Sequence, residues 1–200
     1  MSTFRSVSQA AAPALIGGAV IGLVGALALF FRQPWLIPSL GPTIFLQLVN
    51  AADPAARPRA ILLGHAIGVA AGFGALFLCG AQGAPPVFGE QILSPGRLVA
   101  TALAVGATIF VQTLAGAKHP PAAATTMLIT LGGVKPAWGA VLAIAAGVAL
   151  AAAAAHVGAQ LLQPGAGVRL GRKKAASVRG HLAKRASPER PARKREPAEA

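Results

Sequence analysis

Four long stretches of the chain carry no charged side chain, and this feature limits the possible folds more than any other. They are residues 14–31, 61–79, 98–115 and 138–162. A helix needs about 20 residues to cross a hydrocarbon core of about 30 Å. Only 12% of the 200 residues are charged, whereas about 25% are charged in a soluble domain. The sequence therefore predicts an all-α protein embedded in a membrane.

Two shorter apolar segments are interrupted by proline or glycine. Residues 35–50 contain two prolines, and residues 120–132 begin with Pro120-Pro121 and end at Gly132, the first of two consecutive glycines. Consecutive prolines stop a helix because each lacks an N–H donor. Irregular backbone inside a bilayer is tolerated only where protein or a watery cavity surrounds it. Each break is therefore a candidate functional site.

We expect a compact bundle of four full spans plus these two broken helices, with six membrane crossings preferred over four. The expected spans are residues 14–31, 35–50, 61–79, 98–115, 120–132 and 138–162. Cytoplasmic loops collect Lys and Arg, and six crossings put Arg57, Arg59 and Lys118 on the same side as both termini. The order of span, broken helix and span occurs twice, which indicates an inverted three-helix repeat. Chance similarity of apolar sequence is the alternative.

Positive charge is concentrated at the C-terminus, because 11 of the 18 Lys and Arg follow Val168. We expect residues 1–9 to form a cytoplasmic segment, residues 10–163 a transmembrane domain, and residues 164–200 a disordered basic tail in the cytoplasm. Contact between the tail and anionic lipid heads is an alternative to a simple topology signal. Nucleic acid is not an expected partner, because the tail has no aromatic residues for stacking.

The second break predicts the start of a helix. A residue before proline is extended, and proline favours the first helical position, so a helix should begin at Pro120 or Pro121. The N–H groups of residues 122–124 should then be unpaired. In the first break, Ser39 is a candidate N-cap and Gly41 permits a close approach. Such helix starts attract anions, and the candidate binding residues are His119, Pro120, Pro121, Ala122, Thr125, Thr126, Ser39, Gly41 and Thr43.

Acidic residues are missing from all the expected spans, since Asp53 and Glu90 lie in loops and the other acids lie in the tail. Buried carboxylates are common in carriers of cations, so an anion or a neutral solute is favoured. His119 and His65 are candidates for a proton-binding or gating role, because histidine titrates near neutral pH. A metal-transport site that also includes His156 is a weaker alternative. The spacing matches no metal-ligand pattern, and we expect no metal, no cofactor and no enzymatic activity.

Glycines recur every fourth residue in two of the expected spans. Gly64, Gly68 and Gly72 share one face of a helix, as do Gly18 and Gly22. This spacing lets helix backbones approach closely. It predicts tight packing within the chain, with a homo-oligomer as the alternative.

The string from Lys118 to Thr125, placed between two uncharged spans, resembles the HPP family of integral membrane proteins. Residues 38–42 and the Gly64-His65 pair also resemble members of that family, which is named for its His-Pro-Pro motif. The resemblance covers roughly residues 10–162. It implies a bacterial inner-membrane or organellar protein, and some relatives are associated with nitrite transport. Only His119, Pro120 and Pro121 match the naming motif itself.

These observations together predict a transporter or channel for a small monovalent anion such as nitrite, bound at the N-termini of the broken helices. The expected location is the bacterial inner membrane, with several crossings. The alternative is a non-transporting membrane anchor or a regulatory partner of another complex, which the basic tail and the glycine faces would suit.

Overall fold

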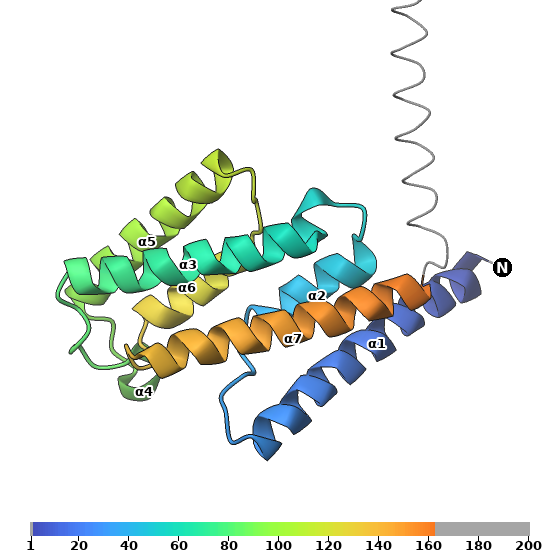
Figure 1. Ribbon diagram of the computed structural model, residues 1–200, viewed down its shortest axis with the longest axis horizontal. Helices are drawn as coiled ribbons and strands as arrows, with labels where there is room; N and C mark the ends of the chain where they lie inside the picture. The colour runs from blue at the N-terminus through green and yellow to red at the C-terminus, as the bar shows by residue number, and fades with distance from the viewer. Residues whose placement is uncertain (1, 163–200) are drawn as a thin grey trace, which may run out of the picture. The chain divides into compact units, whose positions relative to one another are not determined.

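The computed structural model describes residues 2–162, in which all regular structure is helical (Figure 1). The expectations for a disordered tail over residues 164–200 therefore lie outside the described residues. Helices α1, α3, α5 and α7 are each long and apolar enough to cross a membrane. An all-α membrane protein is thereby confirmed. The elements are α1 (Ser2–Phe30), α2 (Leu40–Val49), the 3₁₀ turn η1 (Pro54–Ala56), α3 (Pro58–Leu78), α4 (Val87–Glu90), α5 (Pro95–Leu114), α6 (Ala122–Thr130) and α7 (Trp138–Leu162).

The helices differ from the expected spans in several places, and the two short ones begin later, at Leu40 and Ala122. Helix α1 begins at Ser2, so the residues expected to form a separate N-terminal segment are part of a continuous helix. The apolar stretch of α1 that is suited to a membrane begins at Ala10. The short helix α4 lies in the connection between α3 and α5, where no helix was expected. The cytoplasmic placement of the N-terminus stays a prediction.

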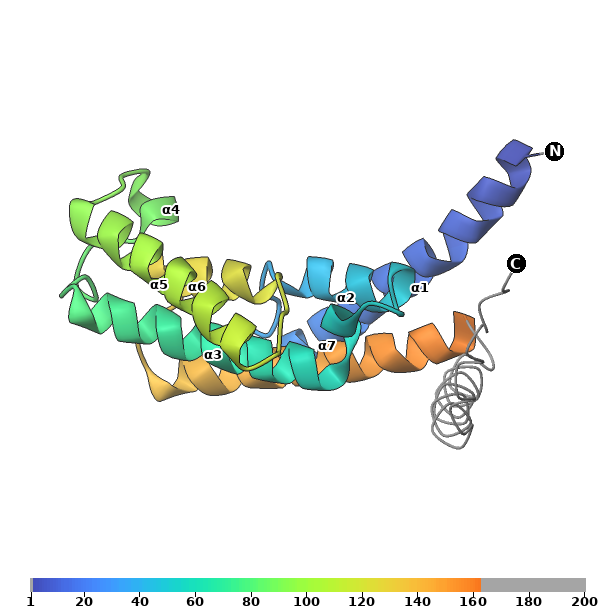
Figure 2. The ribbon, with the colours of Figure 1, turned by 90° about the horizontal axis from the view of Figure 1, so that it is seen from above.

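The two broken helices are too short to span a membrane by themselves. Helix α2 has 10 residues and α6 has 9, which gives each a length of about 15 Å at 1.5 Å per residue. Non-helical residues precede both, over 31–39 and 115–121. Figures 1 and 2 show that each non-helical stretch enters the bundle from one end and that its short helix continues toward the other end. This path agrees with six crossings, although their number stays a prediction.

The last long helix of each half packs against the first two helices of the other half. Helix α3 of the first half packs against α5 and α6, and α7 of the second half packs against α1 and α2. Helices α3 and α7 also contact each other. If α1, α2 and α3 are matched with α5, α6 and α7, the contacts made by α3 match those made by α7. Helices α1 and α5 run in opposite directions in Figure 1. The contact pattern and these directions agree with the inverted three-helix repeat, which stays a prediction together with the number of crossings.

Glycines allow the exchanged helices to approach closely. A Cβ on Gly68 of α3 would lie 2.8 Å from the carbonyl oxygen of Ala122. In the other half, a Cβ on Gly147 of α7 would collide with the carbonyl oxygen of Trp35, which precedes α2. By contrast, the glycines of α1 at positions 18 and 22 have no neighbour within 4 Å of such an added atom. Tight packing within the chain thus accounts for Gly64, Gly68 and Gly72 of α3 and not for those two.

We predict that Gly68→Ala separates α3 from α6, because the new methyl group would also lie 2.9 Å from Thr126 Oγ1. Overpacking of this kind costs about 1–3 kcal/mol. The thermal midpoint of the detergent-purified protein should fall. Gly74→Ala in the same helix is the matched control, since nothing lies within 4 Å of its added Cβ. Equal midpoints for the two variants would contradict the close approach.

We predict opposite membrane sides for residues 118 and 135, because α6 and its lead-in would form a complete crossing. Lys118→Cys and Lys135→Cys both introduce a thiol at an exposed position, in a Cys79→Ala background that removes the free cysteine. A membrane-impermeant maleimide added to oriented vesicles should label only one of the two before permeabilisation. Labelling of both from the same side would instead show that α6 is re-entrant.

Candidate functional site

A cluster of buried polar side chains lies where the starts of α2 and α6 meet α3. It comprises Ser39 directly before α2, Thr43 in the first turn of α2, His65 in α3, His119 in the second break, and Thr125 in the first turn of α6. None of the five is more than 3% exposed. We call them the histidine–hydroxyl cluster. Each of the two broken helices contributes to it, so both predicted breaks converge on one site.

The hydroxyl group of Thr43 joins the two imidazole rings. Its Oγ1 lies 3.0 Å from Nε2 of His119 and 3.3 Å from Nε2 of His65. It also lies 2.8 Å from the carbonyl oxygen of Ser39. The ring centroids of His65 and His119 are 5.0 Å apart. Thr43 therefore stands between two groups that can each gain or lose a proton.

The outer nitrogen of each ring is also bonded. His65 Nδ1 lies 2.9 Å from Thr125 Oγ1, and the Thr125 hydroxyl donates to Ser39 Oγ at 2.7 Å. His119 Nδ1 lies 2.9 Å from the carbonyl oxygen of Ala55, in η1. The bonds thus run without interruption from Ser39, through both rings, to the connection between α2 and α3.

The backbone of the second break is held by Gln112 of α5. Its Oε1 accepts the N–H of His119 at 2.8 Å, and its Nε2 donates to the carbonyl oxygen of Gly64 at 3.2 Å. Gly64 itself permits the contact, because a Cβ there would lie 2.7 Å from Cβ of His119. His119 is non-helical, as expected for a residue before proline. The backbone of His119 is therefore held by α3 and α5, while its ring nitrogens bond Thr43 of α2 and Ala55 of η1.

The expectation of unpaired N–H groups at the start of α6 is wrong. Residues 122, 123 and 124 donate to the carbonyl oxygens of residues 119, 120 and 121, at 3.0, 3.0 and 3.1 Å. The two prolines set helical φ angles, so the chain forms a tight turn that satisfies these donors before α6 begins at Ala122. Ser39 does not cap α2 either, since its side chain makes no capping bond. Polar side chains, rather than bare N–H groups, form the site.

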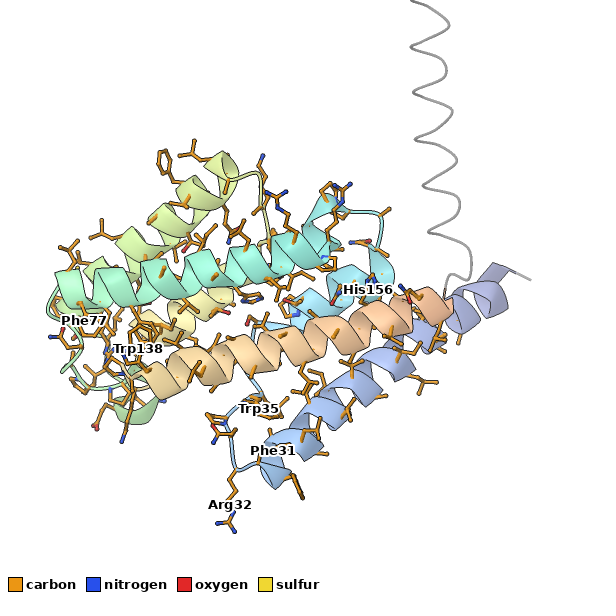
Figure 3. All side chains as sticks on the ribbon, viewed as in Figure 1. Phe31, Arg32, Trp35, Phe77, Trp138 and His156 are labelled. Carbon is orange, nitrogen blue, oxygen red and sulfur yellow. The ribbon has the colours of Figure 1, made fainter. Side chains whose placement is uncertain are left out.

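Other predicted site residues lie around the cluster or away from it. The Thr126 hydroxyl lies on the α5 side, 2.9 Å from Thr108 Oγ1, and donates to the carbonyl oxygen of Gly68 at 3.1 Å. Pro121 and Ala122 are buried and form the turn, whereas Gly41 and Pro120 are exposed. Figure 3 shows His156 toward the C-terminal end of α7, where it is exposed and paired with Gln160. It does not join the other two histidines.

Two buried glutamines complete the surroundings and were missed by sequence reasoning. Gln112 follows Thr108 by four residues, a spacing that places both on one face of α5 and could have indicated a polar contact. Gln47 lies one turn after Thr43 and donates to the carbonyl oxygen of Ala152 at 3.0 Å. Among the described side chains, Gln47 Oε1 is the buried polar atom that has no hydrogen-bond partner.

An apolar groove of about 640 Å³ reaches the cluster from the side of α3 and α7. His65 lies at its wall together with Val69, Phe73 and Val148. Phe77 and Trp138 also line it, at one end of the bundle in Figure 3. The groove therefore places an apolar surface directly beside His65 of α3.

Arg97 lies at the start of α5 and is buried, although it immediately precedes an uncharged run of the sequence. It is only 3% exposed. Its guanidinium donates to the carbonyl oxygens of Ala84, Pro85 and Thr130. The last of these belongs to the final turn of α6, where a cation is favourable to the helix dipole. Gly132, with φ of +84°, leaves room for the guanidinium.

The fold and the site define a multi-pass helical membrane protein with two opposed broken helices around a polar centre. The family model described as "HPP, transmembrane region" matches residues 2–166. The chain belongs to the HPP family, as its His119-Pro120-Pro121 string indicated. Searches of curated proteins and of solved structures found no match.

We predict that Arg97→Met destabilises the bundle, because three carbonyl groups lose a charged donor. Hydrogen bonds to charged groups contribute about 1.5–3 kcal/mol each, so even partial compensation leaves a clear loss. The midpoint of thermal unfolding in detergent should fall by several degrees. Arg59→Met, at an exposed position in the first turn of α3, should leave it unchanged. An unchanged midpoint for Arg97→Met would mean that the three contacts do not support the fold.

Proposed function

We propose that the protein moves a small monovalent anion, such as nitrite, across the membrane as a transporter or channel. The observation that carries the proposal is the meeting of two broken helices, one from each half, at the buried histidine–hydroxyl cluster. Broken helices at corresponding positions of two inverted halves mark the binding sites of many transporters. Membership of a family defined by its transmembrane region supports the same reading.

The groups at this centre suit an anion better than a cation. Hydroxyl groups and imidazole N–H groups can donate hydrogen bonds, and the positive ends of the α2 and α6 dipoles point at the cluster. Each helix end contributes about 0.3–1 kcal/mol, and up to about 2 kcal/mol when partly buried. Among the described residues, the acidic side chains Asp53 and Glu90 are exposed and lie outside the four long helices. Binding would be weak, because desolvation of an anion costs more than these terms return.

An anion must open the cluster before it can bind there. Every polar side-chain atom of the cluster has a partner within the protein, since Gln47 Oε1 is the unpartnered buried atom of the described side chains. The bond between Thr125 and Ser39 joins the two broken helices directly. Separation of α2 from α6 at this bond would free two hydroxyl donors for the anion. The proposed cycle therefore alternates between bonds within the protein and bonds to the anion.

The proposed location is the bacterial inner membrane, with the basic tail in the cytoplasm. The sequence supports it through the concentration of Lys and Arg after Val168, because such residues collect in cytoplasmic segments. No enzymatic activity is part of the proposal.

We predict that His119→Ala abolishes most anion flux, because it removes the ring that links Thr43 to η1. Uptake of nitrite by proteoliposomes containing the full chain measures the effect. His156→Ala is the matched control, since that histidine is exposed on α7 and should retain wild-type flux. Equal flux for His119→Ala and wild type would remove the assigned role of His119.

A wild-type protein that moves nitrite, nitrate and formate no faster than empty vesicles would remove the anion reading altogether. It would favour the membrane anchor instead, and deletion of residues 169–200 should then release a bound partner.

A further inference from the structure

We propose that His65, Thr43 and His119 hold one proton between them and that this proton crosses the membrane together with the anion. The inference rests on the proposed function, because it names the second species that the same site carries. It follows from the number of hydrogen atoms and acceptors in the cluster.

The outer nitrogen of each ring carries a hydrogen atom. A carbonyl oxygen can only accept, so Nδ1 of His119 donates to Ala55 at 2.9 Å. The hydrogen of the Thr125 hydroxyl is used in its bond to Ser39, so Nδ1 of His65 donates to Thr125 at 2.9 Å. A neutral imidazole has only one N–H. Both Nε2 atoms of a neutral pair therefore present lone pairs.

Both of these lone pairs face the hydroxyl of Thr43, which has a single hydrogen to give. The carbonyl oxygen of Ser39, at 2.8 Å, competes for the same hydrogen. At least one imidazole lone pair is therefore buried without a donor when both rings are neutral. One added proton removes this deficit. The protonated ring then donates to Thr43 Oγ1, and Thr43 donates to the other ring.

A second added proton is opposed by electrostatics. Two imidazolium rings with centroids 5.0 Å apart would repel each other in a poorly solvated site. The cluster therefore suits one proton shared through Thr43, in place of two independent titrations.

The shared proton leaves a buried positive charge that needs a counter-ion. The charged residues on the elements around the cluster are Asp53, Arg57, Arg59 and Lys118, which are all exposed, and Arg97, which lies at the other end of α5. The Asp53 carboxylate accepts from the N–H of Ala55 and not from a ring. A buried charge is costly unless it is paired. A monovalent anion would supply the missing partner, so each ion favours the binding of the other.

The apolar groove beside His65 supports joint movement of the two ions. An isolated anion would meet walls such as Val69, Phe73 and Val148 at a large desolvation cost. When the protonated ring transfers its N–H proton to the anion, the ring becomes neutral again and the anion becomes a neutral acid, which avoids most of that cost. The groove therefore suits the neutral pair better than the anion alone.

The test measures nitrite uptake and internal acidification in the same proteoliposomes, with the membrane potential set by potassium and valinomycin. Uptake into protein-free vesicles is subtracted, because nitrous acid itself crosses bilayers. We expect equal initial rates of proton and nitrite entry, with no dependence on the sign of the potential. Nitrite entry that follows the potential without acidification would overturn the shared proton and leave the proposed function standing. A lack of any anion flux would overturn both.

Variants of Thr43 test the bridge itself. Thr43→Val removes the hydroxyl and should slow coupled entry at least about tenfold, as expected for the loss of hydrogen bonds to a charged group. Thr43→Ser should restore most of the rate. Thr113→Val is the matched control, because the Thr113 hydroxyl is exposed and donates to its own helix.

Wild-type rates and coupling in Thr43→Val would overturn the role of the bridge. Size-exclusion chromatography checks that the variant folds. If it does not, the proton-to-nitrite ratio of the wild type and of Thr43→Ser still decides between a shared proton and none.

Discussion

The structure depends on the need to satisfy backbone polar groups at two helix breaks where water is scarce. A bilayer offers no partners for exposed N–H and carbonyl groups. The second break meets this need with the tight turn through Pro120 and Pro121 and with the amide of Gln112. The close approach of α3 at Gly64 and Gly68 encloses the break in protein. The position of both histidines follows from this enclosure, because α3 carries one of them and the break carries the other.

The same constraint explains why a small hydroxyl stands at the centre. Thr43 fits between two rings whose outer nitrogens are already committed to Thr125 and Ala55. A carboxylate in its place would supply a permanent negative charge and repel an anion. A hydroxyl can both donate and accept, so its role changes with the charge of the rings while its position does not. The protonation state of the two rings can therefore change without movement of Thr43.

Much of the architecture could be predicted from local features of the sequence. The uncharged runs predicted the four long helices, and the prolines predicted the two breaks. Both features can be recognised in a short stretch of sequence, because one depends on the length of an apolar run and the other on a missing N–H donor. The pairing of residues 122–124 was mispredicted, since a turn through two prolines can satisfy donors that an ideal helix start leaves free. The contact between His65 and His119 depends on the rotation of α3 against the break, which no local pattern fixes. The burial of Arg97 was not predicted, because the carbonyl group of Thr130 that accepts from it lies 33 residues away in the sequence.

The exchange of helices between the halves has a consequence for how the chain is assembled. The helices that cover α3, which are α5 and α6, are synthesised after it. When α3 first enters the bilayer, its glycine face lacks the helices that cover it, and His65 has Thr43 of α2 but not yet Thr125 of α6 as a partner. Helices of a membrane protein can insert individually before they associate, but here the first three cannot reach their final packing until the last three have been made. Folding of the first half is thus expected to finish only after the second half has been translated.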